Sequence, residues 1–136
     1  MSNLATLTVR QNRLMYFSGT TPASQHFNGQ LSTGDTLRFK LGQTDTGAPL
    51  IDLESSATVN NLTLNANGSG IVITSQGSAG VMATYQIFLG EDDLTMIPGI
   101  YNGELLLVSS ADDLSPDTQL VQFAVYVLPS MAGSLG

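Results

Sequence analysis

The sequence predicts an all-β protein, an antiparallel β-sandwich of about seven strands. Apolar and polar residues alternate in short segments that recur at intervals of roughly ten residues. Clusters of Gly, Pro, Asn, Asp and Ser separate these segments and are typical of turns. No window carries a sustained apolar pattern at helical spacing, so no helix is expected.

The first part of the chain carries the weakest strand pattern. Apolar residues alternate with threonines over residues 5–9, but Leu4 falls on the threonine side. Gly, Thr and Pro residues then interrupt the chain repeatedly. We therefore predict that residues 1–33 form an N-terminal arm or an extra hairpin, attached to a sandwich of residues 34–128. Residues 129–136 follow the last expected strand and are predicted to be a flexible C-terminal tail.

The clearest early strand opens the segment 36–53. Apolar side chains occupy every second position of residues 37–41, with Arg38 and Lys40 between them. This period of two predicts a strand with one buried face and one charged, solvated face. Turn-forming residues at 43–49 end the strand. The chain is then expected to return to the core through Leu50, Ile51 and Leu53.

The later strands are predicted at residues 57–65, 71–74, 81–89, 100–108 and 121–127. The apolar parity changes within the first of these, at Asn60 and Asn61, so a β-bulge or a break is expected there. The last strand alternates Val and Phe with Gln, Ala and Tyr. Because both of its faces are partly apolar, we place it centrally in a sheet.

Length and composition indicate one domain. A chain of 136 residues can bury a sufficient core without cross-links, and this chain has no cysteine. Charged residues make up only 11% of it, against about a quarter in typical proteins. No secretory pattern opens the sequence, and no apolar run is long enough for a transmembrane helix. We expect a protein used without export by the usual route and without a membrane partner.

The charge is distributed unevenly. The four basic residues, Arg10, Arg13, Arg38 and Lys40, lie among the first 40 positions with one acid, giving +3. The remaining residues carry ten acids and no base. Nucleic-acid binding is not expected, because the body of the domain has nothing to neutralise phosphates. The basic front end either attracts the acidic body of a neighbouring copy or simply solvates a strand face.

No pattern points to an enzyme, a cofactor or a metal site. His26 is the only histidine, and a catalytic role would need it beside a nucleophile and an orienting acid. It lies instead in the Gly-, Ser-, Thr- and Pro-rich segment that is predicted to be an arm. The acidic stretches 91–93 and 112–117 could supply oxygen ligands to calcium, but they lack the spacing of a calcium loop. The simpler interpretation is that both are solvated turns.

Three pieces of sequence occur in an order that resembles a known family. The first is LRFKL at 37–41, followed by DTGAP, IDL and ATV up to residue 59. The second is PGIYNGEL at 98–105, and the third is VQFAVYV at 121–127. Together they resemble the immunoglobulin-like domain of tailed-bacteriophage virion proteins, notably the N-terminal domain of baseplate upper proteins. The resemblance covers roughly residues 31–128 and implies an immunoglobulin-like sandwich.

This resemblance implies a structural virion protein that is made in the host cytoplasm and assembled into the particle. Its place would be the baseplate or tail, or the head as a decorating or fibre-anchoring protein. Its partners would be other virion proteins and copies of itself, in a homo-oligomer. The candidate subunit-contact residues are Arg10, Arg13, Tyr16, Phe17 and Phe27. The three aromatic residues among them could instead close one end of the domain's own core.

A second hypothesis is a β-sandwich module that binds carbohydrate or a cell surface. Such a module needs an exposed aromatic patch, for which Phe88 and Tyr126 are the candidates. With no Trp and only four Tyr residues, the chain is poorly supplied for stacking on sugars.

Overall fold

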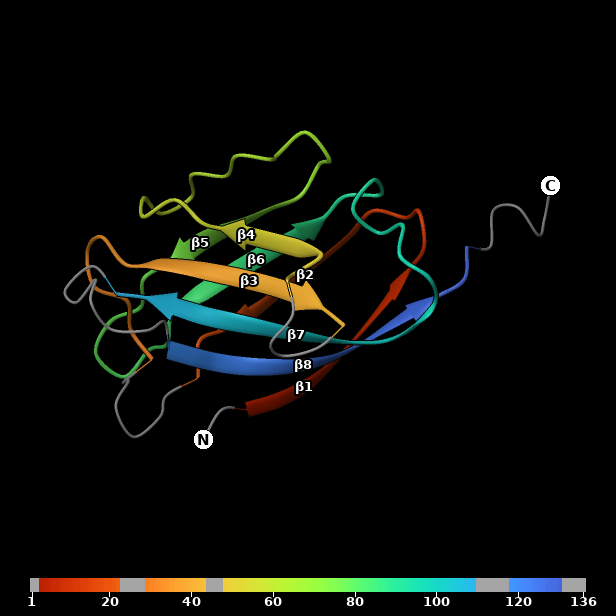
Figure 1. Cartoon of the computed structure of the whole chain (residues 1–136). Helices are drawn as coiled ribbons and strands as arrows, with labels where there is room; N and C mark the ends of the chain where they lie inside the picture. Colours follow the sequence, from red (N-terminus) through yellow and green to blue (C-terminus); the bar gives the residue numbers. More distant parts are fainter. Residues whose placement is uncertain (1–2, 23–28, 44–47, 110–117, 131–136) are drawn as a thin grey trace.

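The computed structural model describes residues 3–22, 29–43, 48–109 and 118–130 of the 136-residue chain. Within this part the protein is all-β, with eight strands in two packed sheets (Figure 1). One sheet has five strands in the order β1 (Asn3–Arg10), β8 (Thr118–Leu128), β7 (Gly99–Val108), β3 (Thr36–Gly42) and β4 (Ile51–Glu54). The other has three, in the order β2 (Met15–Thr20), β6 (Thr84–Leu89) and β5 (Gly70–Ser75).

The sandwich is not wholly antiparallel, in contrast to the sequence-based prediction. β1 runs parallel to β8, with Asn3 beside Val121 and Arg10 beside Leu128. All other pairings between named strands are antiparallel. A parallel pair needs a long connection, and here nearly the whole chain separates the two strands. The prediction that the last strand is central is confirmed, since β8 lies between β1 and β7.

The prediction of an arm or extra hairpin at residues 1–33 is wrong, because this segment supplies one strand to each sheet. The two strands do not pair with each other. They add two strands to the predicted sandwich of about seven, while the strand predicted at residues 57–65 is lost, so the described residues hold eight. Leu7 and Val9 of β1 are buried in the core. Thr21, just after β2, is fully buried, and its hydroxyl donates to the carbonyl of Gly29 at 2.8 Å. Residues 23–28, and residues 131–136 of the predicted tail, lie outside the described parts.

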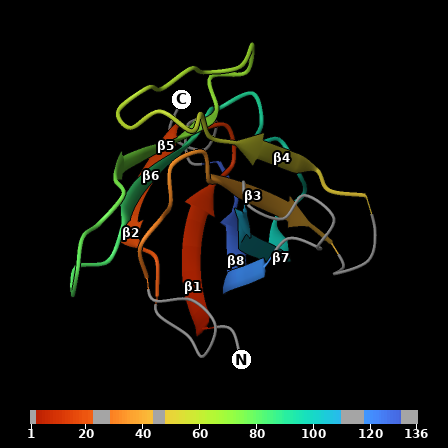
Figure 2. The same cartoon turned by 90° about the vertical axis from the view of Figure 1, so that its left-hand side faces the viewer.

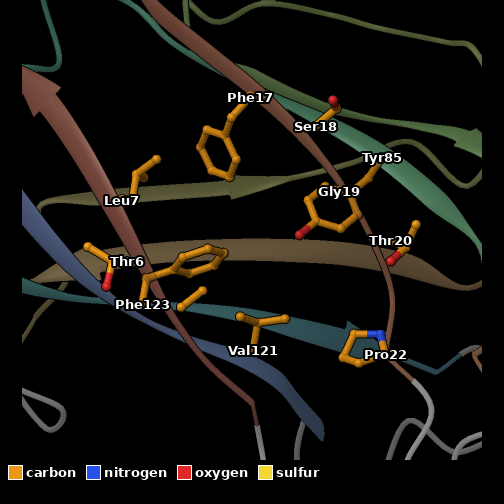
Figure 3. A pocket seen from close by; sticks show the side chains of 11 residues that line it. Thr6, Leu7, Phe17, Ser18, Gly19, Thr20, Pro22, Tyr85, Val121 and Phe123 are labelled. Atoms are coloured by element: carbon orange, nitrogen blue, oxygen red, sulfur yellow. The ribbon is translucent and has the colours of Figure 1, made fainter.

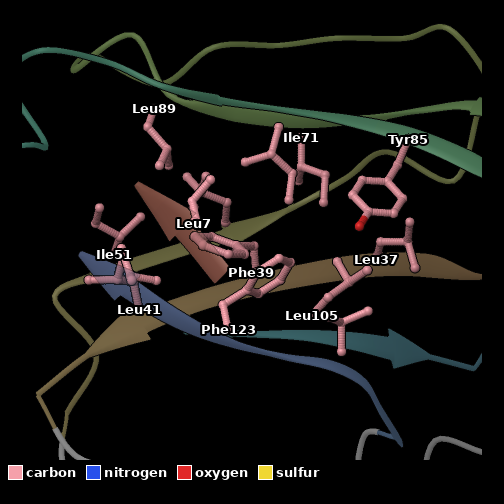
Figure 4. Close-up of a cluster of buried hydrophobic side chains, with 14 of the residues drawn as sticks. Leu7, Leu37, Phe39, Leu41, Ile51, Ile71, Tyr85, Leu89, Leu105 and Phe123 are labelled. Carbon is pink, nitrogen blue, oxygen red and sulfur yellow. The ribbon is translucent and has the colours of Figure 1, made fainter. Parts of the chain in front are cut away.

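The core lies between the two sheets, with Phe39 and Phe123 at its centre (Figure 4). The partly buried Phe17 packs against these two rings. Phe17, Phe39 and Phe123 meet edge to face, with centroids 5.8 to 6.2 Å apart. Edge-to-face contacts align the positive ring edges with negative ring faces, which adds to the hydrophobic gain. Gly103 makes room for this cluster, because a Cβ there would lie 3.1 Å from Val125 and 3.3 Å from Phe123.

Segment 36–53 follows the predicted pattern in most respects. In β3 the apolar residues are buried and Arg38 and Lys40 are only partly so. Ile51 and Leu53 return to the core as predicted, but Leu50 remains half exposed. The alternation of period two therefore identified both faces of β3 correctly. The predicted turn at 43–49 falls partly outside the described residues.

The strand predicted at residues 57–65 is not formed. Asn60 has a φ of 61°, a left-handed conformation that breaks an extended chain at the point where the apolar parity changes. Its N–H donates to the carbonyl of Ile73 in β5 at 2.8 Å. Leu62 and Leu64 are left substantially exposed. The segment is thus an irregular connection that lies against β5, and the break was the correct alternative.

Candidate functional site

The sheet edges differ in how well they are protected against pairing with another chain. β4 is only four residues long and carries Asp52 and Glu54. In the other sheet, the carbonyl of Ile73 in β5 accepts a hydrogen bond from the N–H of Asn60. Short edges, charges and covering segments are the usual protections. β1 has eight residues, contains no proline and carries no charge before Arg10. Its Leu4 is 74% exposed. Among the described residues, β1 is therefore the long edge of the five-stranded sheet and has none of these protections.

The backbone groups that β1 offers to solvent can be assigned. The N–H of Gln11 donates to the carbonyl of Leu128 at 2.9 Å and extends the β1–β8 ladder beyond Arg10. In a parallel pair, alternate residues direct both backbone groups to the partner strand. Odd-numbered residues of β1 therefore bond to β8. The free edge presents the N–H and C=O groups of the even-numbered residues, Leu4, Thr6, Thr8 and Arg10.

β1 and β2 are the edge strands on one side of the sandwich (Figure 2). An apolar groove opens between them. We call it the β1–β2 groove. Its volume is about 440 Å³. The side chains that line it include Ala5, Leu7, Phe17, Tyr85, Val121 and Phe123 (Figure 3). The groove therefore reaches the aromatic core from the side on which neither sheet has a further strand.

Tyr85 supplies a polar group to this apolar wall. Its hydroxyl points into the space between the sheets (Figure 3), next to Gly19, where a Cβ would lie 2.7 Å away. No hydrogen bond joins this hydroxyl to a residue of the described parts. Burial raises the pKa of Tyr85 to about 12, because the phenolate would lose its hydration there. The side chain is therefore a neutral donor or acceptor at neutral pH.

The structure brings together two of the predicted contact residues. Arg10 and Arg13 line one shallow depression of about 270 Å³, with Leu14 and Leu128 also on its walls. The guanidinium of Arg10 donates to the carbonyl of Pro129 at 3.0 Å. Arg13 is exposed in the turn between β1 and β2. Both positive charges thus lie at the end of the sandwich where β1 finishes.

The predicted aromatic contacts separate into different environments. Tyr16 is 65% exposed on the outer face of β2 and stacks on Phe88 of β6, with centroids 5.8 Å apart. Phe17 points the other way, into the core, so the structure favours the alternative interpretation for this residue. Phe27 lies outside the described residues. Of the two aromatic residues that the structure describes, only Tyr16 is therefore placed on the outer surface to touch a neighbour.

The aromatic patch suggested for the carbohydrate hypothesis is not formed as expected. Phe88 faces outward from the three-stranded sheet, and Tyr126 faces outward from β8 in the five-stranded sheet. The two side chains therefore lie on opposite faces of the sandwich. The partner of Phe88 is Tyr16, which sequence reasoning had assigned to an arm.

Arg38 is engaged on the outer face of the five-stranded sheet. It donates two hydrogen bonds to the carboxylate of Asp52, at 2.8 and 2.7 Å. The bond from Arg38 and the positive charges nearby hold the pKa of Asp52 below its usual value. This bidentate pair ties β3 to β4.

The acidic loop at 91–93 has a structural role. The carboxylate of Asp93 accepts hydrogen bonds from the Asn67 amide and the Ser69 hydroxyl. The same hydroxyl accepts the N–H of Gly90 at 2.8 Å. This clamp joins the loop after β6 to the turn before β5. Among the described residues no three His, Cys, Asp or Glu side chains are grouped to hold a metal. His26 and the acidic stretch 112–117 lie outside those residues.

The groove and the free edge were not predicted, because both depend on which strands end each sheet. The sequence does contain two relevant features. Residues 4–9 are uncharged, and small residues, Ala5 and Gly19, stand where β1 and β2 face each other across the groove. Neither feature shows by itself that the strands are edges, since their pairing partners are distant in sequence.

No helix in the described parts of the chain is long and apolar enough to cross a membrane. Comparison of the sequence with protein-family models and with curated proteins found no match.

Proposed function

We propose that this chain is a structural protein of a tailed-bacteriophage virion, an immunoglobulin-like domain that acts by binding neighbouring subunits. One observation carries the proposal. The three pieces of sequence that resemble the phage family fall on β3 and β4, on the start of β7, and on β8. These four strands are adjacent, in the order β8-β7-β3-β4. The resemblance thus covers a continuous layer of the molecule.

The strand order supports the immunoglobulin-like part of the proposal. Opposite the β8-β7-β3-β4 layer lies the order β2-β6-β5. In sequence order these positions correspond to G-F-C-C′ and B-E-D of a variable-type immunoglobulin sandwich. β1 occupies the position beside the last strand. The variable-type sandwich has nine strands, one more than the eight of the described residues, and this chain has no cysteine for the usual disulfide.

Details of the core agree with this correspondence. Tyr101 lies near the start of β7, and its hydroxyl donates to the carbonyl of Ile97, four residues upstream. A tyrosine at this place with this bond is a hallmark of immunoglobulin domains. The usual disulfide joins strands B and F, and a Trp on strand C packs on it. Here Phe17 on β2, Phe39 on β3 and Gly103 on β7 occupy the same part of the core.

The surface supports assembly as the mode of action. The chain carries little charge, the long edge strand β1 is unprotected among the described residues, and apolar side chains such as Leu4 and Tyr16 are exposed. Exposed apolar surface and free edges are favourable where a partner covers them. In a particle that repeats the same contact many times, weak individual contacts are sufficient. The position of the protein would be the baseplate, the tail or the head surface.

Purified particles of the phage that encodes the chain test this proposal. Mass spectrometry of particles banded to constant composition should detect the chain at a stoichiometry comparable to known structural proteins. Gold-labelled antibodies should then mark one part of the particle in electron micrographs. A non-structural protein from the same genome serves as the control for contamination. Absence of the chain from the particles would contradict the proposal.

One observation favours the second candidate, a carbohydrate- or cell-surface-binding module. Tyr16 is exposed on the outer face of the three-stranded sheet and stacks on the half-buried Phe88. Aromatic rings of this kind can bind sugars by stacking. Binding to a glycan array that disappears in Tyr16→Ala would support this candidate. A blank array would exclude it.

A further inference from the structure

We propose that β1 pairs in antiparallel fashion with β1 of a second copy of this chain, about a two-fold axis at Leu7. The two five-stranded sheets would then form one sheet of ten strands. This inference rests on the proposed function, because it identifies the partner and the surface for the subunit contact. It goes further by fixing the strand, the residue register and the symmetry.

The free backbone groups of β1 determine which residues can exchange hydrogen bonds. They belong to the even-numbered residues, as the β1–β8 ladder requires. In an antiparallel pair, opposite residues exchange both bonds at alternate positions. An axis at Leu7 sets Leu4 opposite Arg10 and Thr6 opposite Thr8. All four free residues in each copy are then hydrogen bonded, from Leu4 to Arg10.

The side chains are compatible with the same register. Directly opposite residues lie on one face of a sheet, so inward and outward positions must match. Around Leu7 the sequence ATLTV is nearly symmetric. Ala5 meets Val9 of the second copy on the inner face, and the two Leu7 residues meet each other. Thr6 meets Thr8 on the outer face, a favourable cross-strand pair.

The second strand would also cover the β1–β2 groove. The groove lies beside β1, and Ala5 and Leu7 are among the residues that line it. A strand added to the free edge of β1 continues the five-stranded sheet beside the groove. The inward-facing side chains of this added strand would lie at the opening of the groove. In this register Val9 of the second copy lies next to Ala5, where the wall is smallest. One contact therefore accounts for both the free edge and the apolar opening.

Charge favours a second copy at this edge rather than at β4. Pairing β4 with itself would bring Asp52 and Glu54 of two copies together, which like charges oppose. β1 has no charge between Leu4 and Val9. Arg10 would lie opposite Leu4 of the second copy. In that copy, Leu4 is followed across the sheet by Gln122 and then by Glu104. The positive end of each strand thus approaches the acidic body of the other copy.

Sedimentation equilibrium of the full chain from micromolar to millimolar concentration tests the pairing. The wild type should show a monomer–dimer equilibrium. Thr6→Pro removes an N–H from the free edge without removing a bond to β8, and edge strands tolerate proline there. Its dimer dissociation constant should rise at least about tenfold. Thr6→Val keeps the N–H and the strand preference, so it should dimerise like the wild type.

A charge exchange tests the register and does not depend on proline. With the axis at Leu7, position 6 of one copy faces position 8 of the other. The double variant Thr6→Lys/Thr8→Lys should be monomeric, whereas Thr6→Glu/Thr8→Lys should dimerise in low salt and weaken as salt is added. Circular dichroism and thermal unfolding of each variant establish that the fold is retained.

Three outcomes would overturn the inference. The wild type could stay monomeric at millimolar concentration, or its dimer could be unaffected by both Thr6→Pro and the double-lysine variant. The third is that the Thr6→Glu/Thr8→Lys variant behaves like the double-lysine variant. These outcomes are distinct from failure of the proposed function. A monomer that is nevertheless found in particles would refute only the β1 contact. A β1-paired dimer that is absent from particles would refute only the virion role.

Discussion

At the scale of single residues, alternation predicted side-chain direction well wherever a strand was recognised. Leu37, Phe39 and Leu41 are buried as expected, and Phe88 faces outward. Phe17 was left between a subunit contact and the domain's own core, because an apolar residue on an unrecognised strand has no predicted direction. Its partners Phe39 and Phe123 are distant in sequence, and only the packing of the two sheets brings the rings together.

Tyr85 should make the stability of the protein sensitive to alkaline pH. Burial raises its pKa to about 12, whereas a tyrosine in an unfolded chain has a pKa near 10. The unfolded state therefore loses the proton first, so stability is unchanged below about pH 10 and falls as pH rises toward 12. Urea unfolding at pH 8 and pH 11 should show a loss larger by about 1 kcal/mol for the wild type than for Tyr85→Phe. Equal losses in the two proteins would contradict the buried environment of this hydroxyl.

At the scale of elements, the strands of residues 36–128 were largely predictable, whereas β1 and β2 were not recognised as members of the sheets. The exposed Leu4 disturbs the alternation of β1, and its partner strand β8 lies at the other end of the chain. Apolar residues at Leu62 and Leu64 gave the opposite error, a predicted strand where the chain is irregular. The local alternation of apolar and polar residues indicates which segments can adopt an extended conformation. Pairing with other strands decides which of these segments form a strand.

The clamp between the turn before β5 and the loop after β6 should depend on Gly90. A Cβ at Gly90 would lie 1.8 Å from the carbonyl oxygen of Asn67, which is backbone and cannot turn aside. Gly90→Ala must displace one loop, and we expect a loss of about 2 kcal/mol or more in the free energy of unfolding. Gly99→Ala is the matched control, because its nearest neighbour would be 3.9 Å away. Denaturant titration measures both, and equal stabilities would show that the two loops are not held together.

At the scale of the whole molecule, the sandwich class followed from strand spacing, but the division between arm and domain did not. Sheet membership, the β1–β2 groove and the free edge all arise from contacts between distant parts of the chain. None of them has a local sequence pattern. The candidate site was therefore only partly predictable. Arg10 lies on the free edge and Phe17 lines the groove, whereas Arg13 and Tyr16 lie outside both.

Removal of residues 1–30 should prevent the remaining chain from folding. The deletion takes away β1 and β2, and with them Leu7, Val9 and the partly buried Phe17. It also exposes the edges of β8 and β6. Loss of even one such core side chain costs about 3 kcal/mol or more, a large part of the stability of a small domain. Circular dichroism during heating should show no cooperative transition for the truncated chain. A cooperative transition near that of the full chain would restore the arm interpretation.

The parallel pairing of β1 with β8 has a mechanical consequence. Asn3 begins β1 beside Val121, and β1 and β8 finish together at Arg10 and Leu128. The two ends of the described chain therefore leave from opposite ends of the sandwich (Figure 1). A tension applied between them acts along the strands and shears the β1–β8 ladder, so that its hydrogen bonds share the load. A hairpin arrangement of the termini would instead open one bond at a time. The parallel register would therefore make the β1–β8 ladder resist tension between the two ends of the described chain along its whole length.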